Sequence, residues 1–272
     1  MSIASFQGSI AGKYDAELGP IIFTPYAKDF VAKIAPTLTA PVKVLELAAG
    51  TGRLTKELQA VLPPGSFLTA TDISEEMLAV AKAVVAESGS GGGGGVSVTH
   101  APANMQELTE FSDASFDVVV AQFGFMLVTD YAKAFAEARR VLVPGGRLVF
   151  SVWSSEEKNP MFAIAHRIVS EYAKGKDEAT QAKYETIGKA AYRLSDAAAV
   201  ASHLAAVGFS ASTVSSVPIT VTDTATLARG MVTGTPYTML VPPDEHATCT
   251  TQLQTAFGAT CLLEAHVHEA TA

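Results

Sequence analysis

The chain has 272 residues, with 19 Lys and Arg against 27 Asp and Glu, which gives a formal net charge of -8. Such an acidic chain, without a basic run, does not suit a nucleic-acid or anionic-membrane partner, because phosphate binding relies on clustered Lys and Arg. The length is enough to bury a sizeable core. We therefore expect a single domain over residues 1–272 that acts as a monomer or homodimer.

The cysteines and the apolar runs narrow the class further. Cys249 and Cys261 are too few for a disulfide framework, and no Cys/His spacing matches a zinc site, so reduced thiols are expected and no metal. No apolar run reaches the ~20 residues that span a bilayer, and residues 1–7 lack a basic region followed by an apolar stretch. These features predict a soluble, cytoplasmic protein without a membrane partner.

Residues 1–40 have a helical period from about Gly12 onward. Aromatic and aliphatic residues recur every four positions, at Tyr14, Leu18, Ile22, Tyr26 and Phe30. Pro20 and Pro25 interrupt this pattern, so we predict two short helices.

Residues 42–55 form the stretch around which the chain is organised. The β-branched and leucine residues of 42–47 suit a strand that is buried on both faces, and 51–61 reads as an amphipathic helix. Between them, Ala48 to Gly52 removes side chains where the backbone turns tightly. The helix directs its free N–H groups at this turn, which predicts a polar or anionic ligand there.

Alternation of strands and helices continues after this turn. The predicted strands are 66–71, 96–100, 116–122 and 147–153, and a helix starts at Ser74 with Glu75 and Glu76 in its first turn. The glycine-rich run 88–95 reads as a mobile surface connector, because its ordering entropy is too large to offset.

The C-terminal half adds two helical insertions and two more strands. Helices are expected at 160–173 and 176–189 in the first insertion, at 195–207, and in the second insertion at 224–257. The sixth strand is 209–222 and the last is 261–268. The fold class is therefore α/β, a doubly wound seven-stranded sheet with its ligands at the carboxyl ends of the strands.

Two phosphate-binding motifs compete for the turn at Gly50. A dinucleotide fingerprint requires glycine at Thr55, and a Walker loop requires Gly-Lys-Ser or Gly-Lys-Thr; neither is present. What fits is an acid at the strand end, Glu46, followed by the small-residue turn, with a second acid, Asp72, closing the next strand.

This arrangement resembles the class I S-adenosylmethionine-dependent methyltransferases, in particular the small-molecule, type 11-like members. Their first motif reads acid-x-Gly-x-Gly-x-Gly, and their later motifs resemble Asn104-Met105, residues 116–122, and the helix, Pro144-Gly145-Gly146 turn and strand of 138–150. The N-terminal segment also resembles the start of such proteins, through Phe6, Gln7, Gly8 and Ser9 followed by Tyr14 and Asp15. The resemblance implies a Rossmann-like sheet whose last strand is antiparallel.

The resemblance also implies a division of the chain. Residues 1–40 would form a lid over the cofactor or a cap on the sheet, 42–153 the cofactor-binding core, and 156–192 and 224–258 helical insertions that govern specificity. The implied cofactor is S-adenosyl-L-methionine, held by ten residues. These are Tyr14, Glu46, Ala48, Gly50, Gly52, Asp72, Ile73, Asn104, Met105 and Gln122.

Two of these residues depart from the family pattern. Ala48 replaces the first glycine, which is a mild change if its φ is negative, and Asn104 replaces an aspartate while keeping an acceptor oxygen for the adenine amino group. Asp72 is expected to accept the ribose hydroxyls; the alternative is that it only caps the following helix.

Fewer sequence features indicate which residues contact the methyl acceptor. Tyr26, Phe123, Met126 and His166 are the candidate substrate residues, and His166 is also the candidate general base. Glu264, His266 and His268 share one face of the last strand, which could suggest a metal; the preferred interpretation is a half-exposed edge strand with solvent-facing histidines.

The predicted function is methyl transfer to a small-molecule acceptor by in-line displacement, with O-, N- and C-methylation left open. One alternative is a nicotinamide-dependent oxidoreductase, against which the absent third glycine argues. Another is a non-catalytic S-adenosylmethionine-binding module, which Ala48 and Asn104 leave open.

Overall fold

One seven-stranded sheet forms the centre of the protein. The computed structural model describes residues 9–86, 95–174 and 176–272. The strand order is β3-β2-β1-β4-β5-β7-β6; β1 to β5 run parallel and β7 runs antiparallel to both of its neighbours. The strands are Lys43–Glu46 (β1), Phe67–Asp72 (β2), Ser97–Pro102 (β3), Phe116–Gln122 (β4), Leu142–Trp153 (β5), Ala211–Val221 (β6) and Cys261–Thr271 (β7). The predicted Rossmann-like sheet with an antiparallel last strand is confirmed.

The central position of β1 explains its sequence. β1 pairs with β2 on one edge and β4 on the other, and helices cover both of its faces, so Val44 and Leu45 are 1% and 0% exposed. The middle of a strand enclosed in this way is apolar at successive positions instead of alternating, as at Val44 and Leu45. Its carboxyl end, with the turn that follows, therefore lies beside the carboxyl ends of β2 and β4.

The Pro144-Gly145-Gly146 turn is a bulge at the start of β5. Phe116 pairs with Leu142 and Val118 with Arg147, so the residues between Leu142 and Arg147 loop out of the ladder. The φ of Gly145 is 79°, and its N–H donates to the carbonyl of Ala272 over 2.9 Å.

The last strand is not at the edge of the sheet, so the preferred interpretation of its histidines is wrong. β7 lies between β5 and β6, and His268 pairs with Phe150 on one side and Val214 on the other. The side chain of His268 is consequently 2% exposed and stacks on the ring of Phe150 at 5.0 Å. The edge strand at this end of the sheet is β6, and β3 forms the opposite edge.

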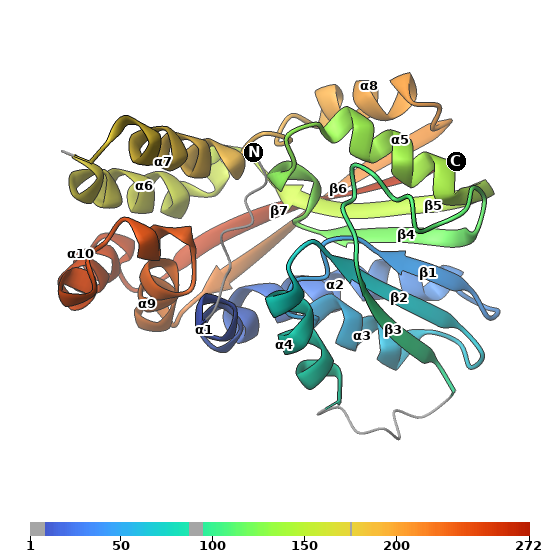
Figure 1. Cartoon of the computed structure of the whole chain (residues 1–272), viewed down its shortest axis with the longest axis horizontal. Coiled ribbons are helices and arrows are strands. Elements are labelled where there is room, and N and C mark those ends of the chain that lie inside the picture. The colour runs from blue at the N-terminus through green and yellow to red at the C-terminus, as the bar shows by residue number, and fades with distance from the viewer. Residues whose placement is uncertain (1–8, 87–94, 175) are drawn as a thin grey trace.

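The helices form layers on both faces of the sheet. In Figure 1, α2, α3 and α4 lie on one face, α5 and α8 lie on the other, and α1, α6, α7, α9 and α10 gather at one end. The helices of the faces are Thr24–Ile34 (α2), Arg53–Val61 (α3), Glu75–Ala86 (α4), Tyr131–Val141 (α5) and Ala197–Ala206 (α8). Those at the end are Ser9–Leu18 (α1), Pro160–Ala173 (α6), Glu178–Ala190 (α7), Thr224–Thr233 (α9) and His246–Phe257 (α10).

The N-terminal segment contains two short α-helices, as predicted, and differs from the prediction in where the first begins and how the two are connected. Helix α1 starts at Ser9 instead of Gly12, and a π-helical turn, Gly19–Phe23 (η1), joins it to α2. The prolines do not break the helix because Pro20 and Pro25 occupy the first turns of η1 and α2, where no intrahelical N–H bond is lost. Phe6, Gln7, Gly8 and most of the glycine-rich connector lie outside the described residues.

Across the described ranges, no helix combines the length and the apolar character that crossing a lipid bilayer requires.

Candidate active site

The turn after β1 has a left-handed backbone at three positions. The φ angles of Ala48, Gly50 and Gly52 are 52°, 56° and 80°. The N–H of Ala49 donates to the carbonyl of Thr71 over 2.8 Å, which holds the turn against β2. The condition under which alanine at 48 would be a mild change is therefore not met: an L-residue there carries about 1–2 kcal/mol of backbone strain.

Asp72 connects this turn to the next strand. Its Oδ2 accepts the N–H of Gly50 over 2.8 Å, and its Oδ1 accepts the N–H of Ser74 over 2.9 Å. The side chain is 9% exposed, and burial raises its pKa while these backbone donors lower it. Asp72 thus orders the turn and the start of α4 together, and it also borders the adjoining cavity.

Glu46 lies beneath the turn instead of in the cavity. It is 1% exposed, and its Oε2 accepts the Thr55 hydroxyl of α3 over 2.7 Å. Burial raises its pKa to about 8, which keeps the carboxyl group largely protonated at neutral pH. Its geometry supports the turn from below and gives no direct contact with a ligand in the cavity.

Gly52 also has a packing function. It is the N-cap of α3, and a Cβ placed on it would lie 2.9 Å from the Cα of Ala81 in α4. Because a real Cβ cannot approach a backbone atom so closely, glycine is required for α3 and α4 to meet.

A cavity opens over the turn at the carboxyl ends of β1, β2 and β4. Eight of the ten predicted cofactor residues line it: Tyr14, Ala48, Gly50, Asp72, Ile73, Asn104, Met105 and Gln122. The structure thus brings together residues that are far apart in the sequence, as expected at the strand order's switch between β1 and β4.

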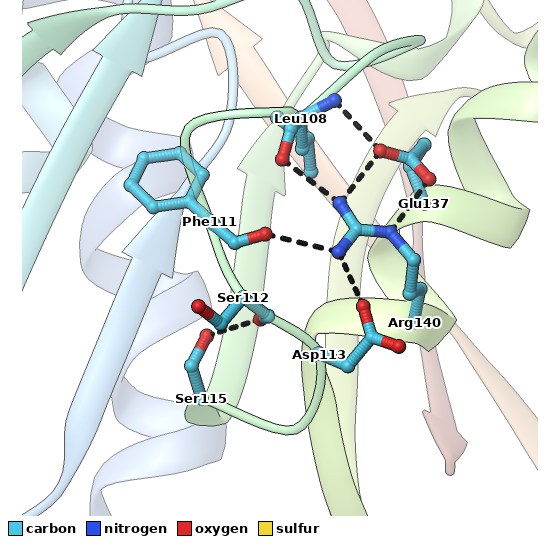
Figure 2. A network of polar contacts seen from close by, with 7 residues as sticks. All are labelled: Leu108, Phe111, Ser112, Asp113, Ser115, Glu137 and Arg140. Carbon is cyan, nitrogen blue, oxygen red and sulfur yellow. Dashed lines mark hydrogen bonds and ion pairs between the residues drawn. The ribbon is translucent and has the colours of Figure 1, made fainter.

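Asn104 and Met105 lie on the segment that connects β3 to β4. The Oδ1 of Asn104 accepts the N–H of Gln106 over 3.1 Å, an Asx-type turn, and Met105 is 7% exposed. The carbonyl groups of this segment are tied to Arg140 of α5 (Figure 2).

A second cavity adjoins the first and is almost entirely apolar. Tyr14, Phe123 and Leu127 line both cavities, and the second one is otherwise enclosed by aliphatic and aromatic side chains that include the predicted Met126. Met161 and Phe162 come from α6 and Met231 from α9.

Phe123 stands between the two cavities. Its φ is 57°, unusual for a bulky residue, and its N–H donates to the carbonyl of Ser151 over 3.0 Å. The ring stacks on Trp153 with centroids 4.1 Å apart, and Tyr26 meets it edge-on at 5.3 Å. Strain of this kind is kept only where the surroundings hold it, here by two aromatic neighbours.

Tyr14 covers both cavities because α1 is anchored at several points. Asp15 makes two hydrogen bonds with Arg53 of α3, of 2.7 and 2.6 Å, and Glu17 pairs with Arg229 of α9 at 2.7 Å. Burial, and then the charge of Asp72, raises the pKa of Tyr14, so its hydroxyl stays protonated at neutral pH.

Two predicted substrate residues do not reach the cavities. Tyr26 is 3% exposed and supports Phe123 and Trp153 from below instead of lining either cavity. His166 faces the groove between α6 and α7, where its ring stacks on Tyr184 at 3.9 Å. Its face of α6 points away from the one that carries Met161, so the interpretation of His166 as a substrate residue and general base is not supported.

Several lining residues were missed from the sequence. Ser74, Met77, Gln106 and Val128 border the first cavity, and Trp153 and Tyr237 border the second. Trp153 ends β5, so the rule that ligands bind at carboxyl strand ends could have identified it. Tyr237 belongs to a short 3-10 turn that carried no such signal.

The described residues contain no cluster of His, Cys, Asp or Glu that could hold a metal ion. Glu264 instead accepts the Ser154 hydroxyl over 2.9 Å, and the pKa of His268 is lowered by burial to about 4. Cys249 and Cys261 are both free and buried.

The fold and this site define a Rossmann-like α/β protein whose ligand cavity lies over a small-residue turn and a strand-end aspartate. Residues 45–150 match the model of a methyltransferase domain. This part of the chain is a class I S-adenosylmethionine-dependent methyltransferase domain.

Curated relatives agree with this assignment. The chain is 38% identical over 119 residues to the ubiquinone/menaquinone biosynthesis C-methyltransferase UbiE of Psychromonas ingrahamii. These residues make up 44% of this chain and 45% of UbiE. It spans roughly half the length of the curated relatives it matches.

Two solved structures share the fold at low identity. Phosphoethanolamine N-methyltransferase 2 of Haemonchus contortus, in complex with S-adenosyl-L-methionine, has a TM-score of 0.60 at 16% identity, covering 96% of this chain and 56% of that one. The [4+2]-cyclase SpnF has a TM-score of 0.55 at 16% identity, covering 90% and 80%. The fold by itself therefore does not determine the reaction.

Proposed function

We propose that this protein transfers a methyl group from S-adenosyl-L-methionine to a small, largely apolar acceptor. One observation carries the proposal: a cavity floored by the Gly50 turn and Asp72 meets an aromatic cavity at Phe123. In this proposal the core of 42–153 holds the cofactor, and the lid of 1–40 and the insertions of 156–192 and 224–258 enclose the acceptor.

The residues of the first cavity fit the cofactor. Asp72 accepts the N–H groups of Gly50 and Ser74 on its two carboxylate oxygens, and Ile73 is a third backbone donor. A carboxylate has about four lone-pair sites, so one is left for a ribose hydroxyl group. Ile73, which is 50% exposed, and Met105 offer apolar contacts for a planar base. Bound there, S-adenosylmethionine would supply an electrophilic methyl group on a positively charged sulfur.

The second cavity sets the class of acceptor. Its described lining carries no Asp, Glu, Lys or Arg, so burying a charged acceptor there would be costly. A neutral aromatic molecule therefore fits best. The name of the UbiE relative, a C-methyltransferase of ubiquinone and menaquinone biosynthesis, favours a quinol-type ring carbon among such molecules.

The chemistry requires little from the protein beyond alignment and exclusion of water. S-Adenosylmethionine, held by the residues of the first cavity, would supply its methyl group to the electron pair of the acceptor atom, and the electron pair of the broken carbon–sulfur bond would stay on sulfur as a neutral thioether. Tyr14 and Tyr237 are the only titratable side chains in the described lining of the second cavity, and burial raises the pKa of both. Neither tyrosine is therefore a base at neutral pH, so the acceptor would bind neutral and give up its proton to water once the bond to the methyl group has formed.

Binding and turnover test the proposal in two steps. Calorimetry with S-adenosylmethionine and with NAD distinguishes a methyltransferase from the oxidoreductase alternative. A methyltransferase should bind S-adenosylmethionine and not NAD. Incubation with naphthoquinol and naphthol, followed by mass spectrometry, then detects the added methyl group. Binding without any methylated product would favour the non-catalytic module instead. The net charge of -8 argues against a nucleic-acid partner. A cytoplasmic location and a monomeric or homodimeric state are part of the proposal.

A further inference from the structure

The segment between β3 and β4 carries the base end of the proposed cofactor site without a helix or strand of its own. Asn104, Met105 and Gln106 all line the first cavity, yet the segment has only one isolated bridge, between Asn104 and Glu107. A loop this irregular needs an external support to hold three lining residues in place.

Arg140, in the last turn of α5, supplies that support. Its Nη2 donates to the carbonyl of Leu108 over 2.8 Å, and its Nη1 donates to the carbonyl of Phe111 over 2.9 Å and to Asp113 over 2.7 Å. Figure 2 shows the guanidinium group enclosed by these acceptors. A planar fork fixes the direction of several acceptors at once, which a point charge does not do.

Glu137 completes the arrangement from one helical turn earlier. Both of its carboxylate oxygens accept from Arg140 at 2.8 Å, and Oε2 also accepts the N–H of Leu108 over 2.7 Å. The hydrogen bonds from Arg140 lower the pKa of Glu137, so the pair is ionised at neutral pH. Leu108 is thereby held at its N–H and its carbonyl, and its side chain is fully buried.

The segment has a second attachment near the start of α5. The Oε1 of Gln106 accepts the Thr129 hydroxyl over 3.0 Å and the N–H of Asp130 over 2.8 Å. Asp130 is the N-cap of α5. Both ends of α5 thus hold the segment, and its position relative to the turn at Gly50 follows the position of this helix.

We propose that Glu137 and Arg140 are positioning residues for cofactor binding: they set the place of Asn104, Met105 and Gln106 against the adenine end of the ligand. This inference rests on the proposed function. Neither residue lines the cavity, so the effect is transmitted through the backbone of 104–111.

The test compares Arg140→Met and Arg140→Lys with Arg139→Met. Arg139 is the neighbouring residue on the same helix, and among the described residues its side chain donates one long hydrogen bond, of 3.3 Å, to the carbonyl of Gly208. Arg139→Met therefore removes the same charge as Arg140→Met without removing the contacts to residues 108–113. We measure the dissociation constants of S-adenosylhomocysteine and of adenosine by calorimetry, and hydrogen exchange of the amides at 104–111.

We expect Arg140→Met to raise the dissociation constants of both ligands by about tenfold or more, because a small displacement of a segment that contacts the ligand costs much of its binding. Arg140→Lys should recover part of this affinity, and Arg139→Met should change neither ligand. Hydrogen exchange at 104–111 should accelerate in the order of the affinity losses. If Arg140→Met fails to fold, Arg140→Lys carries the comparison.

Two other outcomes are distinct. If the parent protein binds S-adenosylhomocysteine and both Arg140 variants bind it equally well, the positioning role is overturned even if their melting temperatures fall. If the parent protein does not bind S-adenosylhomocysteine at all, the proposed function fails first, and the cofactor role of the pair fails with it.

Discussion

Gly124 passes directly beneath Ala48: a Cβ added to Gly124 would lie 2.6 Å from the Cβ of Ala48 and 3.1 Å from Met105. The residue after Phe123 is therefore pressed against the turn that floors the first cavity. Gly124→Ala should destabilise the protein by about 1–3 kcal/mol through overpacking and weaken cofactor binding as the turn is displaced.

A double-mutant cycle tests the contact between Ala48 and Gly124. Ala48→Gly removes the colliding methyl group and tolerates the positive φ, so Gly124→Ala should cost less in that background. Denaturant unfolding of the two single variants and the double variant measures the coupling. Strictly additive effects would show that the contact is not the cause.

Asp72→Ala should weaken S-adenosylmethionine binding by about 1.5–3 kcal/mol, the range for hydrogen bonds that involve a charged group. The control is Asp117→Ala, because Asp117 also accepts a backbone N–H, that of Lys43 over 2.7 Å, at the opposite end of β1. Calorimetry should find the loss only for Asp72. Equal affinities for both variants would remove Asp72 from the cofactor site.

Variants of Phe123 and His166 test whether the acceptor binds in the second cavity or in the groove between α6 and α7. Phe123→Leu should reduce acceptor turnover by about tenfold and should also weaken cofactor binding, because its ring lines both cavities. His166→Ala should leave both quantities unchanged. Initial rates with naphthoquinol at saturating cofactor decide this; a loss of turnover in His166→Ala would restore its role as a base.

His268 should make the protein sensitive to acid. Its pKa is about 4 in the folded protein against an ordinary 6.5, so between these values the unfolded chain binds more protons. The contribution of His268 to the free energy of unfolding is complete above pH 6.5 and is lost as the pH falls toward 4, amounting to about 3 kcal/mol. Urea unfolding of His268→Phe should lack this component; curves parallel to the parent's would contradict it.

Glu46 should act in the opposite direction. Its pKa is about 8 when folded against 4.5, so the folded protein binds more protons within that window. Its contribution is complete below pH 4.5 and declines as the pH rises through 8. Glu46→Gln, which imitates the protonated carboxyl group, should be more stable than the parent protein above that pH by on the order of 4 kcal/mol. Equal unfolding free energies there would mean that Glu46 is ionised at little cost.

The centre of the sheet could be predicted because β4 and most of β5 carry continuous apolar runs. β4 was predicted at both boundaries, and α6 likewise, since each has a clear apolar pattern and flanking polar residues. The place of β7 was wrong for a physical reason: alternating polar residues resemble an exposed edge, whereas the side chain of His268 is stacked on Phe150 inside the sheet.

The cofactor side of the site was more predictable than the acceptor side. Gly50 and Asp72 are close to strand ends whose order follows from the fold, so their meeting could be inferred. The second cavity instead depends on the packing of α9 against α1 and on the placement of α6. Which face of α6 turns inward cannot be read from one helix alone, and His166 was accordingly placed on the wrong side.

The position of β7 has a consequence for the order in which the sheet is assembled. Within the described chain β6 pairs only with β7, although β6 comes earlier in the sequence. It can find no partner until residues far downstream have docked on β5. Contacts of such long sequence separation form slowly, so we expect β6 and β7 to join the sheet after its parallel strands, with the edge at Val214 the last to gain protection.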